Sequence, residues 1–266
     1  MSPETVNHLP GSGINTIGQP FIELLQVEST NSYAIDKIQA KLAAHGTVWF
    51  AREQTAGRGQ RGKEWFTEPG SNIILSVVAD MSSLSMHQQF PLSAAVALAA
   101  HDLFNKYTQG DTAIKWPNDI YWRDRKAAGI LIENVLRGNT WHWAVIGIGM
   151  NINQTSFPEN MRNPVSLKQI TGKDFNAVAL AQELCNNLEQ YYQQLKRGEV
   201  DAIMQQYHQH LYRYKQPVRL KKGNISFNCT IEGVSNEGDL LISNGPQERF
   251  SFGEVEWVIP VNDSPI

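Results

Sequence analysis

Glycines and cations alternate between residues 54 and 65 of this chain. In order, the run contains Gln54, Gly57, Arg58, Gly59, Gln60, Arg61, Gly62, Lys63 and Trp65. Glycine permits positive φ and close approach of backbone N–H groups, so such a loop can hold phosphate or carboxylate oxygens beside its cations. The spacing is not that of a P-loop. A flexible surface loop or a nonspecific RNA contact is an equal alternative if this run is taken alone.

Two lysines follow in a second group of residues. Lys115-Trp-Pro-Asn-Asp119 ends one predicted strand, and Lys126-Ala-Ala-Gly129 begins a hairpin-like return. Two lysines on neighbouring strands can converge on one anionic ligand and stabilise a phosphoryl group while its charge is redistributed. The alternative is that Pro117, Asn118 and Asp119 only form a turn and that both lysines are solvated.

A third group is Gly147-Ile-Gly-Met-Asn151. It differs from a dinucleotide fingerprint, because Ile152 stands where the third glycine belongs and no convincing helix follows. The glycines can let a strand end pass close to a ligand or to another part of the protein. Asn151 could then offer its amide to a base or a ribose.

The fourth group, Ser29-Thr-Asn31, precedes a predicted helix at residues 32–42. One of these residues would cap that helix, since Ser, Thr and Asn are favoured at this position. Three consecutive polar side chains can also present hydroxyl and amide groups to a small polar ring.

Short strands and helices alternate around these groups. The pattern predicts strands at residues 47–51, 73–79, 112–116, 128–133 and 141–148, and helices at 32–42, 92–107, 177–196 and 201–211. This mixture indicates an α/β or α+β body that would bring the four groups together.

The chain divides into three parts. Residues 1–20 are rich in Pro and Gly and are expected to form a flexible lead-in, residues 21–213 the main body, and residues 214–266 a small C-terminal domain. Strands are predicted in the last part at 217–220, 225–234, 239–243, 247–252 and 255–259. Five short strands with tight turns are typical of a small barrel of the SH3 kind.

Composition excludes several classes of protein. The net charge of −3 provides no overall field for nucleic acid or an anionic membrane, and no apolar run is long enough to span a bilayer. Cys185 and Cys229 are far apart in sequence, so we expect buried thiols and a cytoplasmic protein. The histidines show no metal-ligand spacing.

Taken together and in their order along the chain, from residues 29–31 through 54–65 and 115–133 to 147–151, the four groups resemble the biotin protein ligase family. The resemblance runs from about residue 23 to residue 154 and more loosely to the C-terminus. The resemblance implies an α/β catalytic domain built on a mixed sheet and followed by an SH3-like domain. It also implies two reaction steps. Biotin and MgATP would form biotinyl-5'-AMP, and a lysine of a biotin carboxyl carrier protein domain would then accept the biotin.

The family pattern assigns roles to particular residues. Lys126 would be the catalytic residue, assisted by Arg58. Biotin would lie among Ser29, Thr30, Asn31, Gln54, Arg58, Gly59, Gln60, Lys126 and Gly129. ATP and the adenylate would lie beside Arg61, Lys63, Trp65, Lys115, Asn118, Asp119 and Asn151.

The sequence departs from the pattern in the glycine-rich loop. Gln60 stands where an arginine is often found, and Lys63 is a later basic position. We therefore expect weaker retention of biotinyl-AMP. Some relatives are repressors with an N-terminal DNA-binding domain, whereas about twenty irregular residues precede the body here, so we expect no operator binding. A homodimer is compatible with the sequence.

Two other functions compete with this one. A lipoate-protein ligase or octanoyltransferase would share a related fold and would also acylate carrier lysines, but the loop and the Lys-Trp-Pro-Asn-Asp group resemble the biotin side. A nonenzymatic RNA-binding module would use the basic loop and the small barrel. The acidic net charge and the lack of interleaved aromatic residues on the barrel argue against it.

Overall fold

The computed structural model describes residues 16–159, 161 and 163–259. Most of the predicted lead-in, residues 1–15, lies outside this part of the chain. The helices are α1 (Thr30–Gln39), α2 (Gln89–Thr108), α3 (Leu167–Thr171), α4 (Ala177–Lys196) and α5 (Val200–Gln209), with short 3-10 turns η1 (Gln60–Gly62) and η2 (Met86–Gln88). The strands are β1 (Phe21–Leu24), β2 (Val48–Ala51), β3 (Ile73–Asp80), β4 (Thr112–Lys115), β5 (Asp119–Trp122), β6 (Arg125–Arg137), β7 (Thr140–Met150), β8 (Pro217–Lys222), β9 (Ile225–Val234), β10 (Leu240–Ser243), β11 (Arg249–Phe250) and β12 (Glu256–Trp257).

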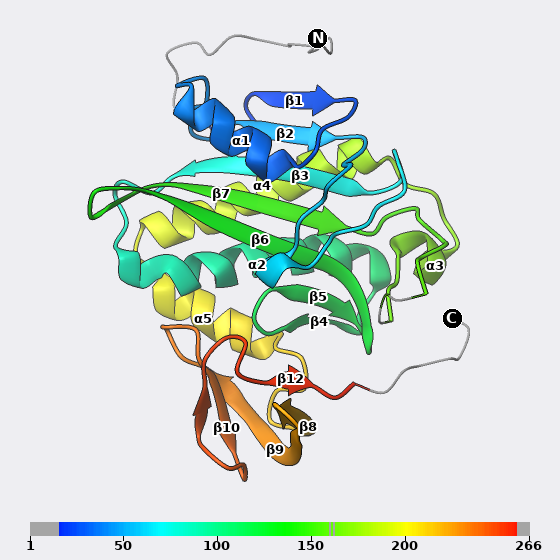
Figure 1. Cartoon of the computed structure of the whole chain (residues 1–266), viewed down its shortest axis with the longest axis vertical. Helices are drawn as coiled ribbons and strands as arrows, with labels where there is room; N and C mark the ends of the chain where they lie inside the picture. Colours follow the sequence, from blue (N-terminus) through cyan, green and yellow to red (C-terminus); the bar gives the residue numbers. More distant parts are fainter. Residues whose placement is uncertain (1–15, 160, 162, 260–266) are drawn as a thin grey trace.

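The main body is built on one mixed sheet of seven strands in the order β1-β2-β3-β7-β6-β5-β4. β1 pairs with β2 in parallel, and the other neighbours are antiparallel. The predicted α/β class with a mixed sheet is confirmed. The connection between β2 and β3, which carries the glycine-rich loop, crosses in front of β7 and β6 in Figure 1.

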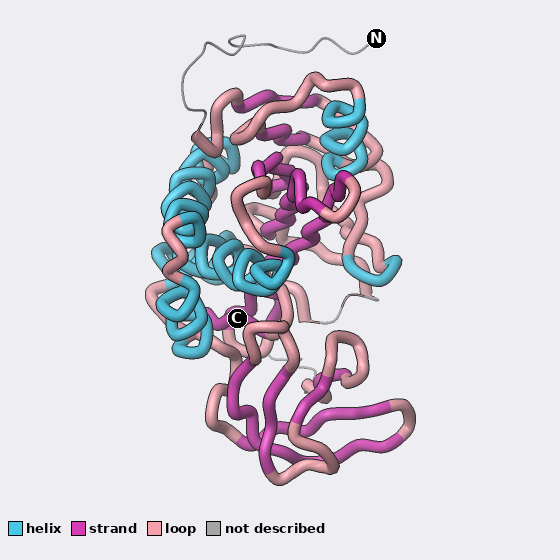
Figure 2. Tube along the Cα trace, turned by 90° about the vertical axis from the view of Figure 1, so that its left-hand side faces the viewer, coloured by secondary structure: helices cyan, strands magenta, loops and turns pink. Residues whose placement is uncertain are grey.

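Helices cover the sheet unequally. Figure 1 shows α2 and α4 behind the sheet and α1 in front of it, and in Figure 2 the larger helices gather along one side. Side chains alternate between the faces along β2, so Val48 and Phe50 belong to the large core with α2 and α4, whereas Trp49 packs on the α1 side. The α1 face is only partly covered by a helix, which leaves it available for the site.

The helix α4 has a clear apolar repeat in its sequence, and this repeat lies on the buried face of the helix. Its apolar residues recur at helical spacing, as in Leu180, Leu184 and Leu188, and all three are buried. Asn176 caps the helix through its side chain, which accepts hydrogen bonds from the backbone N–H groups of Val178 and Ala179. The predicted bounds of 177–196 are confirmed.

The C-terminal sheet, β8 to β12, is antiparallel with the order β11-β10-β9-β8-β12. All five strands predicted there are present, and this sheet lies below the main body in Figures 1 and 2. Both cysteines are buried with free thiols, as expected, and burial raises their pKa. Within the described ranges, no helix has the length and apolarity needed to cross a membrane.

Several predicted boundaries were wrong. β1 and β5 were missed, and their place depends on pairing with neighbouring strands. The five-residue helix α3 was also missed, because it is too short to show a helical repeat. The helix predicted at 32–42 begins at Thr30 and ends at Gln39. β6 extends well beyond the predicted 128–133, because a tight turn with Gly138 at φ 60° joins it to β7 as one long hairpin.

Candidate active site

A cluster of buried polar side chains surrounds the start of α1. The Gln54 carboxamide oxygen accepts hydrogen bonds from the Thr30 backbone N–H at 2.7 Å and from the Thr30 hydroxyl at 3.1 Å. Ser29 is the N-cap residue, but its side chain makes no capping bond. One of residues 29–31 is therefore at the N-cap as predicted, but it is the Gln54 side chain, from the glycine-rich loop, that accepts the hydrogen bond from the Thr30 N–H in the first turn.

Asn31 connects this cluster to the sheet. Its amide nitrogen donates to the backbone oxygen of Leu131 at 3.2 Å and to the Glu133 carboxylate at 2.8 Å. Its amide oxygen lies 2.5 Å from the hydroxyl of Ser76. A side chain at Gly147 could not fit here, since its Cβ would lie 2.3 Å from that amide oxygen. The close approach predicted for the glycines of β7 is therefore made to Asn31.

The glycine-rich loop folds into a small hairpin. The Gly59 N–H donates to the oxygen of Lys63 at 2.6 Å, and the Trp65 N–H donates to the oxygen of Gly57 at 2.9 Å. Arg58 reaches back from the hairpin and pairs with Glu133 at 3.0 Å. Arg58 and Asn31 therefore contact the same carboxylate, that of Glu133.

A bare strip of sheet lies beneath the indole of Trp65. Gly129 on β6 and Gly149 on β7 are direct cross-strand partners. A Cβ at Gly149 would lie 2.3 Å from the indole ring, and one at Gly129 would lie 2.9 Å from it. Gly147 and Gly149 share a face because they are two residues apart on one strand. We call Gly129, Gly147 and Gly149 the glycine strip; Asn31 packs on it at Gly147, and the Trp65 indole packs on it at Gly129 and Gly149.

Two lysines flank Asp119 at the end of the strip. The Lys126 ammonium lies 2.6 Å from the Asp119 carboxylate and 5.6 Å from the centre of a Trp65 ring. Lys115 is on β4, and β5 separates this strand from β6. The prediction that both lysines lie on neighbouring strands was therefore wrong, although both are close to Asp119 in space.

Lys115 has an unusual environment. Its ammonium lies 5.2 Å from the ring centre of Tyr121 and 5.7 Å from that of Trp257, which belongs to the C-terminal sheet. Burial lowers the pKa of Lys115 to about 8, against the opposing effect of Asp119. The positive charges of Lys126 and Lys63 contribute to this lowering in addition to burial. Both lysines therefore lie beside Asp119, where they could act on one anion.

Two of the residues predicted to contact the nucleotide, Asn118 and Asn151, donate side-chain hydrogen bonds to backbone oxygens. The Asn118 amide donates to the oxygen of Ile130, and the Asn151 amide donates to that of Val165 at 3.2 Å. The Asn151 amide oxygen is buried and has no hydrogen-bond partner among the described residues. Arg61 points to the C-terminal sheet, where it bonds to the oxygen of Gly253, and Lys63 is exposed.

Sequence reasoning missed three residues of this region. Ser76 is the one polar residue in the interior of the otherwise apolar strand β3, which ends at Asp80, and this is a signal that could have identified it. Glu133 ends the run that begins at Lys126, but its pairing with Arg58 requires the fold. Nothing in the sequence placed Trp257 beside Lys115.

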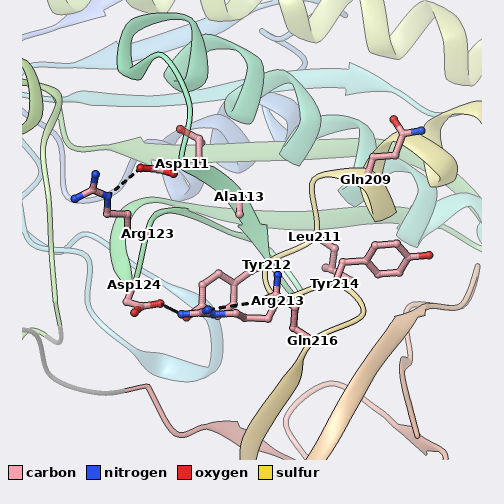
Figure 3. A pocket seen from close by; sticks show the side chains of 11 residues that line it. Asp111, Ala113, Arg123, Asp124, Gln209, Leu211, Tyr212, Arg213, Tyr214 and Gln216 are labelled. Atoms are coloured by element: carbon pink, nitrogen blue, oxygen red, sulfur yellow. Dashed lines mark hydrogen bonds and ion pairs between the residues drawn. The ribbon is translucent and has the colours of Figure 1, made fainter.

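A separate pocket of about 620 Å³ lies at the other end of the β4–β5 hairpin from Lys115 and Asp119. Figure 3 shows Arg123 directed at Asp111 and Asp124 directed at Arg213, and both pairs are within 2.9 Å. Its four charged side chains are therefore already paired with one another within the main body. The chemistry points to the glycine strip instead.

The cations at the two ends of the glycine strip can hold anionic groups close to each other. Arg58 is at one end of it and Lys126 at the other, and buried polar atoms between or near them lack partners among the described residues, notably Gln60 Oε1 and Trp65 Nε1. A buried polar atom without a partner is unfavourable, and a polar ligand would satisfy it. Fixed cations of this kind stabilise charge that develops on oxygens during acyl or phosphoryl transfer.

Comparison with known proteins gives a consistent result. Residues 24–151 match the model of the biotin/lipoate A/B protein ligase family. The chain is 29% identical to the bifunctional ligase/repressor BirA of Escherichia coli, over 86% of this chain and 71% of that protein. It is also 29% identical to a biotin–[acetyl-CoA-carboxylase] ligase of Paracoccus denitrificans, over 85% of this chain and 95% of that one.

Solved structures agree on the fold. The biotin protein ligase from Aquifex aeolicus in complex with biotin and ATP superposes with a TM-score of 0.71 at 22% identity, over 91% of this chain and 96% of that one. The biotin protein ligase of Leishmania major in complex with biotinyl-5-AMP has a TM-score of 0.61 at 24% identity, over 87% of this chain and 98% of that one. At these identities the likeness concerns the arrangement of the chain.

Proposed function

Because this chain belongs to the biotin/lipoate A/B protein ligase family, we propose that it is an ATP-dependent biotin protein ligase. The observation that carries the proposal is the strip of glycines with Arg58 at one end and the Lys126–Asp119 pair at the other. A small acid could lie along this strip with its polar ring in the cluster of Thr30, Asn31 and Gln54.

In the first step, the carboxylate of biotin attacks the α-phosphorus of ATP, and the bond to the leaving pyrophosphate breaks. Two anions must approach each other, so the barrier depends on fixed positive charge. Lys126 would contact both the carboxylate and the α-phosphate, and Lys115 would neutralise phosphate oxygens beside it. The product is biotinyl-5'-AMP, a mixed anhydride.

In the second step, the amine of a carrier lysine attacks the carbonyl carbon of the anhydride, and AMP leaves. The carrier would be a biotin carboxyl carrier domain of a biotin-dependent carboxylase. Arg58 and Gly59 with Gln60 would cover the intermediate from the hairpin, which would limit attack by water. The transfer therefore requires the carrier lysine to reach the Lys126 end of the strip.

Further parts of the proposal concern the surroundings of the reaction. Mg²⁺ would accompany ATP and neutralise its phosphate oxygens, and Asp119 is the carboxylate beside the lysines that could contact it. We also propose that the enzyme is cytoplasmic and that it does not bind an operator. A homodimer is compatible with this proposal. Sequence-dependent, salt-resistant binding to DNA would contradict the second point.

The direct test is pyrophosphate exchange into ATP by the purified protein with Mg²⁺. Biotin, lipoate and octanoate are compared as the required acid. Exchange that depends on biotin supports the proposal. Exchange with lipoate or octanoate alone would assign the chain to the other branch of the family, and exchange with none of the three acids would contradict adenylation.

The pKa of Lys115 predicts a pH dependence. With a pKa of about 8, this lysine is about nine-tenths protonated at pH 7 and only about one-tenth at pH 9. Its contribution to ATP binding is present below the pKa and is lost as pH rises through it. We expect the KM for ATP to rise by up to about tenfold from pH 7 to pH 9.

The Lys115→Arg variant checks the origin of this effect, because arginine stays protonated throughout that range. Its KM for ATP should vary less with pH than that of the unchanged protein. Lys196→Arg, at the exposed end of α4, is the matched control. An identical pH profile in Lys115→Arg and in the unchanged protein would exclude Lys115 as the titrating group.

The Gln60→Arg variant should slow the escape of biotinyl-AMP. The Gln60 amide oxygen is buried without a described partner, and an added guanidinium could pair with the adenylate phosphate. We expect release to slow by about tenfold in a single-turnover assay without carrier, the equivalent of one good charge-assisted hydrogen bond. Gln39→Arg adds the same charge at the far end of α1 and, as the control, should leave the release rate unchanged. An unchanged release rate for Gln60→Arg would contradict the role of position 60 in retaining biotinyl-AMP.

A further inference from the structure

Arg61 attaches the glycine-rich loop to the C-terminal sheet. Its Nη1 donates a hydrogen bond to the backbone oxygen of Gly253 at 2.9 Å, and its guanidinium lies 5.8 Å from the ring centre of Phe252. These contacts join residues that are 192 positions apart in the chain. They link the hairpin over the site to the turn between β11 and β12.

The turn that contains Phe252 and Gly253 leaves space for the Arg61 guanidinium. Gly253 has φ 87°, and a Cβ at this position would lie 1.9 Å from Arg61 Nη1. The ring of Phe252 meets Trp116 edge to face at 6.0 Å, next to Lys115 of the site. Phe252 is nevertheless 48% exposed, so it contributes little to the core of the sheet.

Arg61 itself is held in an uncommon conformation. Its φ of 57° and ψ of 39° fall in the left-handed region, which few residues other than glycine adopt without support. Its side chain crosses to the C-terminal sheet, whereas Arg58 of the same hairpin points to Glu133 in the opposite part of the site. The two arginines therefore attach the hairpin at two separate places.

We propose that Phe252 and Gly253 hold the glycine-rich loop over the site through Arg61, which makes Arg61 a positioning residue. This inference rests on the proposed function and refines it, because Arg61 was expected to contact the adenylate. The C-terminal sheet then takes part in retaining the intermediate. Loosening of the turn would open the loop and let biotinyl-AMP escape before the carrier arrives.

The experiment compares Phe252→Ala, Arg61→Ala and the double variant in the full chain. The first readout is hydrogen exchange of the Gly59 and Trp65 amides, which close the hairpin. The second is release of biotinyl-AMP in a single turnover without carrier. Each single variant should speed exchange and release by about threefold or more, and the double variant should add nothing, as for partners in one contact.

Two further variants separate positioning from a general loss of stability. Phe252→Tyr keeps the ring and should behave like the unchanged protein. Val258→Ala, which removes another exposed apolar side chain from the C-terminal part, should alter neither readout. An effect of Val258→Ala equal to that of Phe252→Ala would overturn the inference.

A different pattern would also overturn it. If Arg61→Ala speeds release while Phe252→Ala changes neither exchange nor release, Arg61 acts on the ligand directly and not through the sheet. The proposed function is judged separately, by whether the unchanged protein forms biotinyl-AMP at all. Hydrogen exchange of the Gly59 and Trp65 amides in the ligand-free protein still tests whether Arg61 holds the loop to the C-terminal sheet.

Discussion

Replacing Lys126 by alanine is expected to reduce biotin-dependent pyrophosphate exchange by about 100-fold or more, the usual effect of removing one fixed donor to a developing oxyanion. Lys126 is the cation placed both at the glycine strip and beside Asp119. Without it, the carboxylate of biotin and the α-phosphate would meet next to an unneutralised aspartate. The measurement is the exchange rate at saturating biotin and ATP.

The control variants test whether the loss of exchange comes only from Asp119, which loses its partner in Lys126→Ala. Lys126→Met combined with Asp119→Asn removes both charges of the pair, so the carboxylate of Asp119 no longer faces the substrates without Lys126, and exchange should still be lost. Lys168→Ala breaks a comparable pair with Asp174 at 2.7 Å, outside the site, and should leave exchange unchanged. Thermal unfolding verifies that each variant is folded. Exchange within threefold of normal in Lys126→Ala would remove this residue from the mechanism.

The sequence predicted most of the elements, and the failures have a common physical cause. The helix at 177–196 was found because its apolar face repeats over five turns. β5 was missed because four residues after a turn carry no such repeat, and its place depends on pairing with β4 and β6. Local periodicity therefore predicted the long helix well, whereas the place of β5 depends on contacts that a local pattern does not contain.

The site followed the same rule. The residue types that can bind anions were identified from the sequence, because glycines and cations in one loop already suggest that chemistry. Their partners were not identified, since Asn31 meets Ser76 and Arg61 meets Gly253 only after distant segments have packed together. Gln54 is instructive, because the sequence did not predict that its carboxamide also accepts hydrogen bonds from Thr30 at the start of α1. The fold decides which polar groups are free and which are already paired.

The Gly149→Ala variant is expected to lose at least about tenfold in exchange activity and about 1–3 kcal/mol of stability, as for other cases of overpacking. The new Cβ would lie 2.3 Å from the indole of Trp65, a rigid ring that cannot bend away. The ring must leave the strip or the hairpin must shift, and either change disturbs the surface on which the acid would lie. Exchange rates and thermal unfolding measure the two effects.

A double variant tests whether the indole is the cause. Gly149→Ala combined with Trp65→Ala removes the clash, so the added methyl group should destabilise the protein much less than it does when Trp65 is present. Activity should stay low, because Trp65 also contacts the Lys126 ammonium and covers the strip. Thr140→Ala, at the exposed start of the same strand, serves as the control. Losses of stability that simply add would mean that Gly149 is required for some reason other than the indole, and the strip would then lose its role as the surface beneath Trp65.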